Sequence, residues 1–129
     1  MFGYRQPSLT VAIANKSAVA VGMRIEFKAN ATLLSPSLIN VVTQEYFKIN
    51  KEMQAGERIV VDTTIGEKKV QGIVGGEALN YFKYRDLQST WLQLAVGDNI
   101  FRYDADSDIG NLEVYVYFRN KYLEVQACY

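Results

Sequence analysis

The sequence predicts an all-β protein, an antiparallel β-sandwich of about nine or ten strands with little or no helix. Apolar and polar residues alternate along most of the chain, which is the period of a half-buried strand. Nine Tyr and six Phe stand among the 129 residues, and aromatic side chains favour pleated strands. Turn-forming residues also recur at roughly ten-residue spacing, as in sandwiches and small barrels.

Residues 9–129 are predicted to form one β-sandwich domain, because a chain of 129 residues suits one domain and is short for two. Residues 1–8 (MFGYRQPS) are predicted to be a linker or docking arm, since Gly3 and Pro7 interrupt any regular element.

The first half of the chain contains the clearest strand pattern, over residues 19–28. Its apolar positions share one face, and these are Val19, Val21, Met23, Ile25 and Phe27. A shorter alternation precedes it at Leu9, Val11 and Ile13. Pro36 is expected to separate two short strands, Ala31 to Leu34 and Leu38 to Thr43, because proline lacks a backbone donor. Residues 45–50 (EYFKIN) are expected to bury Phe47 and Ile49.

The second half begins with a predicted hairpin. Arg58 to Thr64 and Lys69 to Val74 are its strands, joined through a short turn at Ile65-Gly66-Glu67. Gly75-Gly76 is expected to end it, and Glu77 to Leu87 is the one segment predicted to contain a helical turn. The remaining expected elements are a strand at Thr90 to Val96, a turn at Gly97-Asp98-Asn99, a strand at Ile100 to Tyr103, a loop at Asp104 to Asn111 and a strand at Leu112 to Val125.

Composition argues against most catalytic chemistry. The chain has no histidine and one cysteine, Cys128, so His-based triads, His-ligated zinc and thiolate clusters are not expected. Carboxylates such as Asp62, Glu67, Glu77 and Asp86 are scattered, and nothing in the sequence pairs them as glycoside hydrolysis would require. We therefore predict no enzyme activity, no catalytic residue and no cofactor.

Charge and hydropathy restrict the partners. Fourteen basic and fourteen acidic residues cancel, so nucleic-acid binding is not predicted. No stretch approaches the ~20 apolar residues of a membrane span, and residues 1–8 lack a signal-peptide pattern. We expect synthesis in a cytoplasm and no membrane insertion.

Three acids invite comparison with a calcium loop. Asp104, Asp106 and Asp108 alternate as its first ligands do, but Ile109 stands where that loop needs glycine and Tyr115 where it needs glutamate. A solvated hairpin loop with Asx turns is the preferred interpretation. The three aspartates remain weak calcium candidates, and no metal site is predicted.

Two aromatic groups are candidate binding residues. Tyr81 and Tyr84 lie in the irregular segment, and Tyr115, Tyr117 and Arg119 are predicted to share the outer face of the last strand. Such a stripe can pack into a neighbouring protein or stack on a sugar, and tyrosines pairing with each other on an ordinary sheet surface is the third interpretation. Trp91 is expected to be a packing residue.

Four pieces of the second half occur in a familiar order. Residues 56–63 read GERIVVDT and are followed by Lys68-Lys69-Val70 and Gly76-Glu77-Ala78-Leu79; residues 86–94 then read DLQSTWLQL, before Gly97-Asp98-Asn99. These resemble the G-D-x-I-x-I-D-T and L-x-S-x-W-x-x-L-x-x-G-x-N stretches of the distal tail protein family of long, non-contractile-tailed phages and prophages of Gram-positive hosts. The resemblance covers residues 56–125 best.

The resemblance implies a galectin-like, jelly-roll type sandwich equivalent to the family's C-terminal domain. It implies a structural role in the baseplate at the virion tail tip, with synthesis in the bacterial host cytoplasm. Partners would be other tail proteins or receptor-binding proteins used in host attachment. In the family, an N-terminal domain forms a hexameric ring, and this sequence lacks that domain. A hexamer is therefore expected only if the ring domain is present, whether this sequence is a shortened form of the protein or the product of a split gene. The alternative function is a carbohydrate-binding module that recognises host-surface glycan, although the shared motifs provide no sugar-contacting residue.

Overall fold

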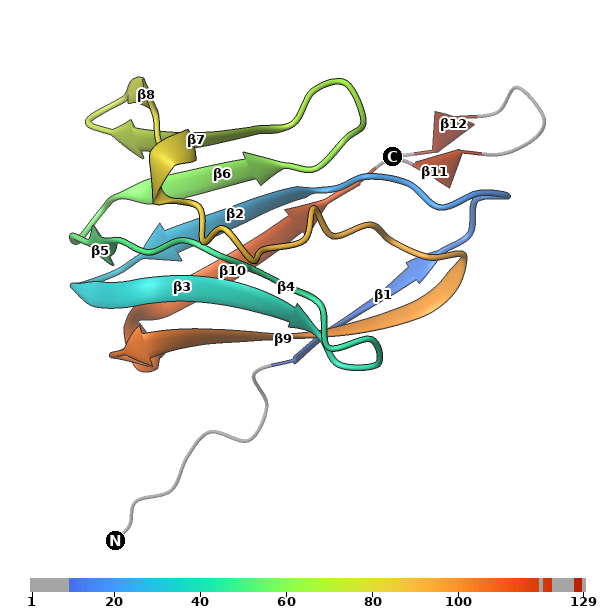
Figure 1. The fold of residues 1–129 in the computed structure, drawn as a ribbon, viewed down its shortest axis with the longest axis horizontal. Helices are drawn as coiled ribbons and strands as arrows, with labels where there is room; N and C mark the ends of the chain where they lie inside the picture. Colours follow the sequence, from blue (N-terminus) through green and yellow to red (C-terminus); the bar gives the residue numbers. More distant parts are fainter. Residues whose placement is uncertain (1–9, 119, 122–126, 129) are drawn as a thin grey trace, which may run out of the picture.

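The computed structural model describes residues 10–118, 120–121 and 127–128, in which two five-stranded antiparallel sheets pack against each other (Figure 1). The first sheet has the order β1-β9-β3-β4, with β5 also paired to β3, and the second has the order β10-β2-β6-β7-β8. The predicted all-β sandwich of nine or ten strands is confirmed. Among the described residues there is no α-helix, and no helix long and apolar enough to cross a membrane. The predicted arm, residues 1–8, lies outside the described residues.

The chain passes back and forth between the two sheets, and each sheet contains one group of three consecutive strands. The first sheet comprises β1 (Thr10–Asn15), β3 (Leu33–Asn40), β4 (Tyr46–Lys48), β5 (Glu52–Met53) and β9 (Gly97–Ser107). The second comprises β2 (Arg24–Ala29), β6 (Arg58–Asp62), β7 (Lys69–Val74), β8 (Glu77–Asn80) and β10 (Leu112–Tyr117). The remaining elements are the 3-10 turns η1 (Phe82–Tyr84) and η2 (Ile109–Asn111), and a small strand pair, β11 (Asn120–Lys121) with β12 (Ala127–Cys128).

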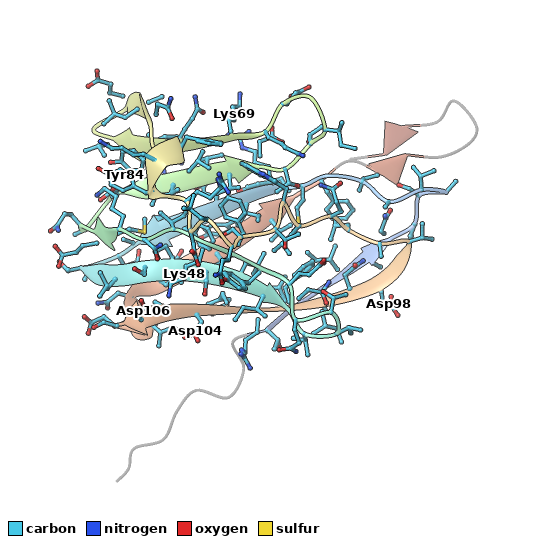
Figure 2. The ribbon with its side chains drawn as sticks, in the orientation of Figure 1. Lys48, Lys69, Tyr84, Asp98, Asp104 and Asp106 are labelled. Carbon is cyan, nitrogen blue, oxygen red and sulfur yellow. The ribbon has the colours of Figure 1, made fainter. Side chains whose placement is uncertain are left out.

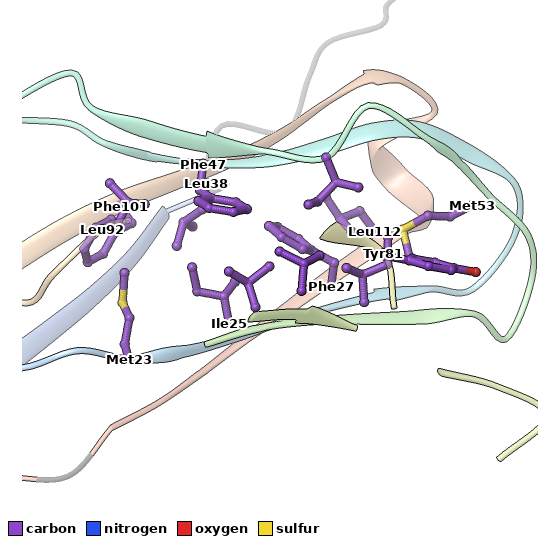
Figure 3. Close-up of a cluster of buried hydrophobic side chains, with 14 of the residues drawn as sticks. Met23, Ile25, Phe27, Leu38, Phe47, Met53, Tyr81, Leu92, Phe101 and Leu112 are labelled. Atoms are coloured by element: carbon purple, nitrogen blue, oxygen red, sulfur yellow. The ribbon is translucent and has the colours of Figure 1, made fainter. Parts of the chain in front are cut away.

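The core lies between the two sheets and contains the apolar positions that the alternation predicts (Figure 3). Phe27 of β2, Phe47 of β4 and Phe101 of β9 are all fully buried. Each fully buried side chain of this size contributes roughly 1.5–3 kcal/mol relative to exposure, before the cost of conformational entropy. This shared core fixes which face of each strand points outward.

The predicted β6–β7 hairpin is confirmed, with Asp62 paired to Lys69. Gly75 and Gly76 have φ of 60° and 84°, as a type I′ turn requires, and they join β7 to a further strand. The expectation of a helical turn over Glu77 to Leu87 is therefore partly wrong, because Glu77–Asn80 is β8. The helical turn is confined to η1.

Pro36 does not divide β3, which corrects the prediction of two short strands. The chain runs straight through, with Leu34 paired to Ser107 and Pro36 to Ala105. Ser35, with φ of 53°, forms a local irregularity, and the Pro36 carbonyl accepts the Ile49 N–H at 3.0 Å. The N–H that proline lacks would face the break between β4 and β5, so its absence costs no ladder hydrogen bond.

Three further boundaries differ from the prediction. The strand expected over residues 19–28 begins only at Arg24, and Val19 is 49% exposed. Thr90 to Val96 is not a strand, since it forms a single bridge, between Leu94 and Val21. The last long strand, expected to reach Val125, ends at Tyr117.

Two further predictions from the sequence are wrong because β9 is one continuous strand. Gly97-Asp98-Asn99 was predicted as a turn but is the start of this strand, and Asp104 to Ser107, predicted as loop, is its end. β9 pairs with β1 over its first part, from Gly97 to Arg102, and with β3 over its later part, from Phe101 to Ser107, and this pairing outweighs the local turn propensity of glycine, asparagine and aspartate.

Candidate functional site

The two predicted aromatic groups lie at opposite edges of the second sheet and do not form one site. Tyr115 and Tyr117 belong to β10, one edge strand, whereas Tyr81 directly follows β8, the other edge strand, and Tyr84 ends the 3-10 turn η1 after it. Four strand spacings of ~4.8 Å, or roughly 19 Å, separate the two edges.

Tyr115 and Tyr117 are on the outer face of β10, as predicted, and are 41% and 52% exposed. Their cross-strand neighbours on β2 are Glu26 and Arg24, so the tyrosines do not pair across strands with other tyrosines. Arg119, the third member of the predicted stripe, lies outside the described residues. The described part of the stripe is thus an exposed tyrosine pair beside charged side chains, and we call it the tyrosine edge.

The hydroxyl of Tyr115 is held in place by its own strand. It donates to Oε1 of Glu113 at 2.6 Å, and Nδ2 of Asn30 donates to Oε2 of the same carboxylate at 2.6 Å. The hydrogen bond from Tyr115, followed by that from Asn30, lowers the pKa of Glu113, while the bond to Glu113 raises the pKa of Tyr115. Tyr115 is therefore neutral and oriented at physiological pH.

The rest of the outer face of the second sheet is a mosaic of opposite charges. Pairing places Arg24 beside Asp62, and Arg58 lies 3.2 Å from the Glu26 carboxylate. Val60, in the middle of this face, is only 4% exposed because the surrounding side chains cover it. The face is thus polar and closely packed, with its exposed aromatic surface at the β10 edge.

Tyr81 is mainly a packing residue. It is 7% exposed, and its ring covers Gly72 so closely that a Cβ there would overlap it. Its hydroxyl donates to Oε2 of Glu57 at 2.9 Å, and Lys51 Nζ lies 3.0 Å from the same oxygen. Burial, assisted by the hydrogen bond to Glu57, raises the pKa of Tyr81 to about 12. Tyr84 packs edge-on against Tyr81, with ring centroids 5.1 Å apart.

The three aspartates do not lie in one loop. Asp104 and Asp106 are exposed on β9, and Asp106 pairs with Lys48 at 3.0 Å (Figure 2). Asp108 follows the strand in a left-handed conformation with φ of 60°. Within the described ranges, no three acidic, histidine or cysteine side chains group as a metal site would need. The structure therefore gives the weak calcium candidates no support.

The most recognisable motif of the sequence has a structural role. Residues 81–96, here called the crossing segment, leave the second sheet after β8 and reach β9 of the first sheet (Figure 1). Asp86 accepts a hydrogen bond from the Tyr46 hydroxyl at 3.0 Å, and Gln93 donates to the Thr63 carbonyl at 2.8 Å. Trp91 packs on Phe47 with centroids 4.9 Å apart, in agreement with the predicted packing role.

A cavity of about 380 Å³ at the β8 edge was not predicted. Its lining includes Lys68, Lys69, Gln71, Leu79, Asn80 and Phe82. The adjacent lysines are the only sequence signal for it, and a single basic pair in a neutral chain is not enough to predict a site.

Comparison with known families gives one match. The family model described as the siphovirus-type tail component, C-terminal domain, matches residues 16–122 of this chain. That family consists of structural domains of phage tails and is not known for enzymes. No curated protein and no solved structure matches the chain.

Proposed function

We propose that this chain, which belongs to the siphovirus-type tail component family, docks neighbouring tail proteins at the tip of a phage tail. Family membership gives it a structural role in the virion tail. The position at the tip and the docking role are the parts that we propose, together with a baseplate protein or a receptor-binding protein as the partner.

The tyrosine edge is the observation that carries this proposal. Tyr115 and Tyr117 expose about half of their surface on a sheet whose other outward side chains are largely charged or covered. Amphipathic aromatic residues are enriched in the cores of protein interfaces, because they bury much apolar area while the hydroxyl keeps a polar partner. Tyr115 is already oriented by Glu113, so docking would cost it little side-chain entropy.

The surrounding charges support a specific partner. Arg24 and Glu26 lie directly across from the two tyrosines, and Lys28 lies across from Glu113. A protein covering this face would meet alternating charges around an aromatic centre, an arrangement that favours one docking register over others.

The direct test is copurification with the products of the adjacent tail genes. The full chain would be co-expressed with each product, and the variant Tyr115→Ala/Tyr117→Ala compared with wild type by size-exclusion chromatography. We expect one product to coelute with wild type and its dissociation constant to rise at least about tenfold in the double variant, since hot-spot aromatics are typically worth 2 kcal/mol or more.

Val42→Ala/Ile65→Ala is the matched control, because these two side chains are 79% and 81% exposed in turns away from the tyrosine edge. It should bind as wild type does. If no tail-gene product binds, or if both double variants bind equally well, docking through the tyrosine edge is wrong.

Glycan recognition is the second candidate, because an exposed tyrosine face can also stack on a sugar ring. A glycan array with wild type and the Tyr115→Ala/Tyr117→Ala variant tests it. A signal lost in the variant would favour this function, and no signal above background would exclude it for the glycans on the array.

A further inference from the structure

The β8 edge combines a free strand edge with a basic cavity. β8 ends the order β10-β2-β6-β7-β8, and among the described residues no strand pairs with its outer side. All four residues of β8 are exposed. Ala78 and Asn80 of β8 line the cavity together with Lys68 and Lys69. This edge lies on the opposite side of the second sheet from the tyrosine edge.

The register identifies the backbone groups that point outward. The Gly75-Gly76 turn makes Val74 and Glu77 a hydrogen-bonded pair, so bonding alternates from there along the hairpin. The N–H of Tyr81 bonds the Val70 carbonyl at 2.9 Å, which fits that alternation. Ala78 and Asn80 therefore occupy the non-bonded positions, and their N–H and C=O groups face away from β7.

The cations beside this edge lack acidic partners. Among the described residues, neither Lys68 nor Lys69 forms a salt bridge, and Lys68 Nζ lies 5.9 Å from the centroid of the Trp91 ring. Asp62, the cross-strand neighbour of Lys69, accepts the Thr64 N–H at 2.9 Å. Figure 2 shows Lys69 on the far side of the molecule from the Lys48–Asp106 pair.

Amide and apolar groups complete the lining. The Asn80 side-chain oxygen accepts the Phe82 N–H at 2.9 Å, which leaves its NH₂ group as a donor. Leu79 and Phe82 are 41% and 43% exposed and provide apolar surface. None of the described residues that line the cavity carries a carboxylate.

We propose that the β8 edge binds an extended acidic segment of a partner protein by strand addition. The partner's backbone pairs with Ala78 and Asn80, its carboxylates lie against Lys69 on the outer face, and its apolar side chains contact Leu79 and Phe82 on the opposite face. Lys68, whose Nζ lies beside the Trp91 ring, adds positive charge on the Phe82 side. Alternate residues of an added strand point to opposite faces, so alternating acidic and apolar residues would satisfy both sets of groups.

A peptide fits this edge better than a free anion does. An inorganic anion would use the ammonium groups, but it would leave the outward backbone groups of Ala78 and Asn80 and the exposed apolar surface unused. An extended peptide matches all three features, because its main chain carries both donors and acceptors.

This inference rests on the proposed function only for the source of the segment, a neighbouring tail protein. Its test needs no tail protein: a short fluorescein-labelled peptide in which glutamate alternates with valine is titrated with the full chain, and anisotropy is measured at about 0.15 M salt. We expect saturable binding, and in ¹⁵N-labelled protein the largest amide shifts at Ala78 and Asn80.

Two variants test separately how the lysine charges and the outward backbone N–H contribute to binding. Lys68→Glu/Lys69→Glu removes the cations, and Ala78→Pro removes an outward N–H without touching a bond between β7 and β8. Each should raise the dissociation constant at least about tenfold, equivalent to ~1.4 kcal/mol. Thermal melts would verify that both variants fold.

Lys16→Glu/Arg102→Glu is the matched control, because it changes the net charge equally at two exposed positions outside the second sheet. It should bind within about twofold of wild type, since exposed charges beyond ~8 Å are largely screened at this salt concentration. Equal loss in this control, or equal binding of a lysine–valine peptide, would overturn the proposal.

Retention of binding in Ala78→Pro together with displacement by inorganic phosphate would also overturn it, since the cavity would then be a site for free anions. Failure of the tyrosine-edge copurification has no bearing on this titration, so the two proposals can fail separately.

Discussion

The crossing segment and the tyrosine edge are both rich in aromatic residues, yet they differ in burial, since large side chains pack into the core in the first region and the tyrosines face outward in the second. In the crossing segment, Tyr81, Leu92 and Leu94 are buried. In the tyrosine edge, Tyr115 and Tyr117 face outward while Val114 and Val116 pack on the core. One of the family-like pieces, residues 86–94, falls in the first region, whereas a plain alternation produces the second. A recognisable motif can therefore mark what the fold needs rather than what the protein binds.

The reason is the backbone of the crossing segment. Outside a regular ladder only some of its N–H and C=O groups find backbone partners, as the Thr90 N–H does at the Tyr46 carbonyl, so side chains must bond others. Asn99 shows this, since its side chain accepts the Ala95 N–H at 2.9 Å and donates to the Ala95 carbonyl at 2.9 Å. Asn15 similarly donates to the Leu94 carbonyl at 3.0 Å. Specific residues at specific spacings are thus required by structure alone.

Among the substitutions that test this contrast, the largest effect on stability is expected in the crossing segment. Leu94→Ala removes a side chain with 0% exposure, and we expect a loss of roughly 3 kcal/mol in the free energy of unfolding. Leu87→Ala in the same segment, at 85% exposure, should change stability by less than ~0.5 kcal/mol. Urea unfolding measures both. Similar effects of the two substitutions would show that the segment does not belong to the core.

A glycine beneath the crossing segment should be nearly as sensitive. Gly72→Ala forces a Cβ into the Tyr81 ring, and we expect a loss of about 2 kcal/mol. Gly110→Ala is the control, because no atom lies within 4 Å of its added Cβ and its φ is not positive. It should be nearly neutral in the same urea experiment. A neutral Gly72→Ala would mean that Tyr81 moves away at little cost.

Removal of the Tyr81 hydroxyl should cost less. Tyr81→Phe loses the hydrogen bond to Glu57, worth about 1 kcal/mol at neutral pH. Because the pKa is raised from 10.0 to about 12 in the folded state, the neutral hydroxyl stabilises the fold fully below pH 10. That contribution is lost as the pH rises through about 12.

Chemical unfolding at several pH values between neutral and the most alkaline pH at which the protein stays folded would measure this. The stability difference between wild type and Tyr81→Phe should shrink above pH 10. A difference independent of pH would contradict the raised pKa.

Alternation predicted the core accurately because a strand buried on one face has an unambiguous period. Met23, Ile25 and Phe27 are buried as expected. The errors come where tertiary pairing outweighs local propensity. Pro36 and Gly97 look like breaks in isolation, but Pro36 lies inside β3, where it pairs with Ala105, and Gly97 begins β9, where it pairs with Asn15.

For a similar reason, the sequence predicted some features of the candidate surfaces and missed others. The outward position of Tyr115 and Tyr117 follows from period two alone. The burial of Tyr81 depends on Gly72 and Glu57, which lie 9 and 24 residues earlier in the chain, and local pattern does not record such contacts. The cavity at Lys68 also depends on where β8 ends and η1 begins.

The smallest expected effect on stability is at the tyrosine edge. Tyr115→Ala/Tyr117→Ala removes two exposed side chains, and we expect the free energy of unfolding to stay within ~0.5 kcal/mol of wild type. Glu113 loses the Tyr115 hydroxyl but keeps the hydrogen bond from Asn30. Urea unfolding checks this, with Val114→Ala on the inward face of β10 as a control that should cost about 1 kcal/mol.

This pairing of a binding assay with a stability assay decides what the tyrosines are for. If the double tyrosine variant loses partner binding while its stability is unchanged, the side chains serve a surface function, because packing no longer explains their presence. If it unfolds more readily than Val114→Ala, the tyrosines support the sheet through cross-strand contacts with Arg24 and Glu26. The tyrosine edge would then resemble the crossing segment, and the contrast between the two regions would be lost.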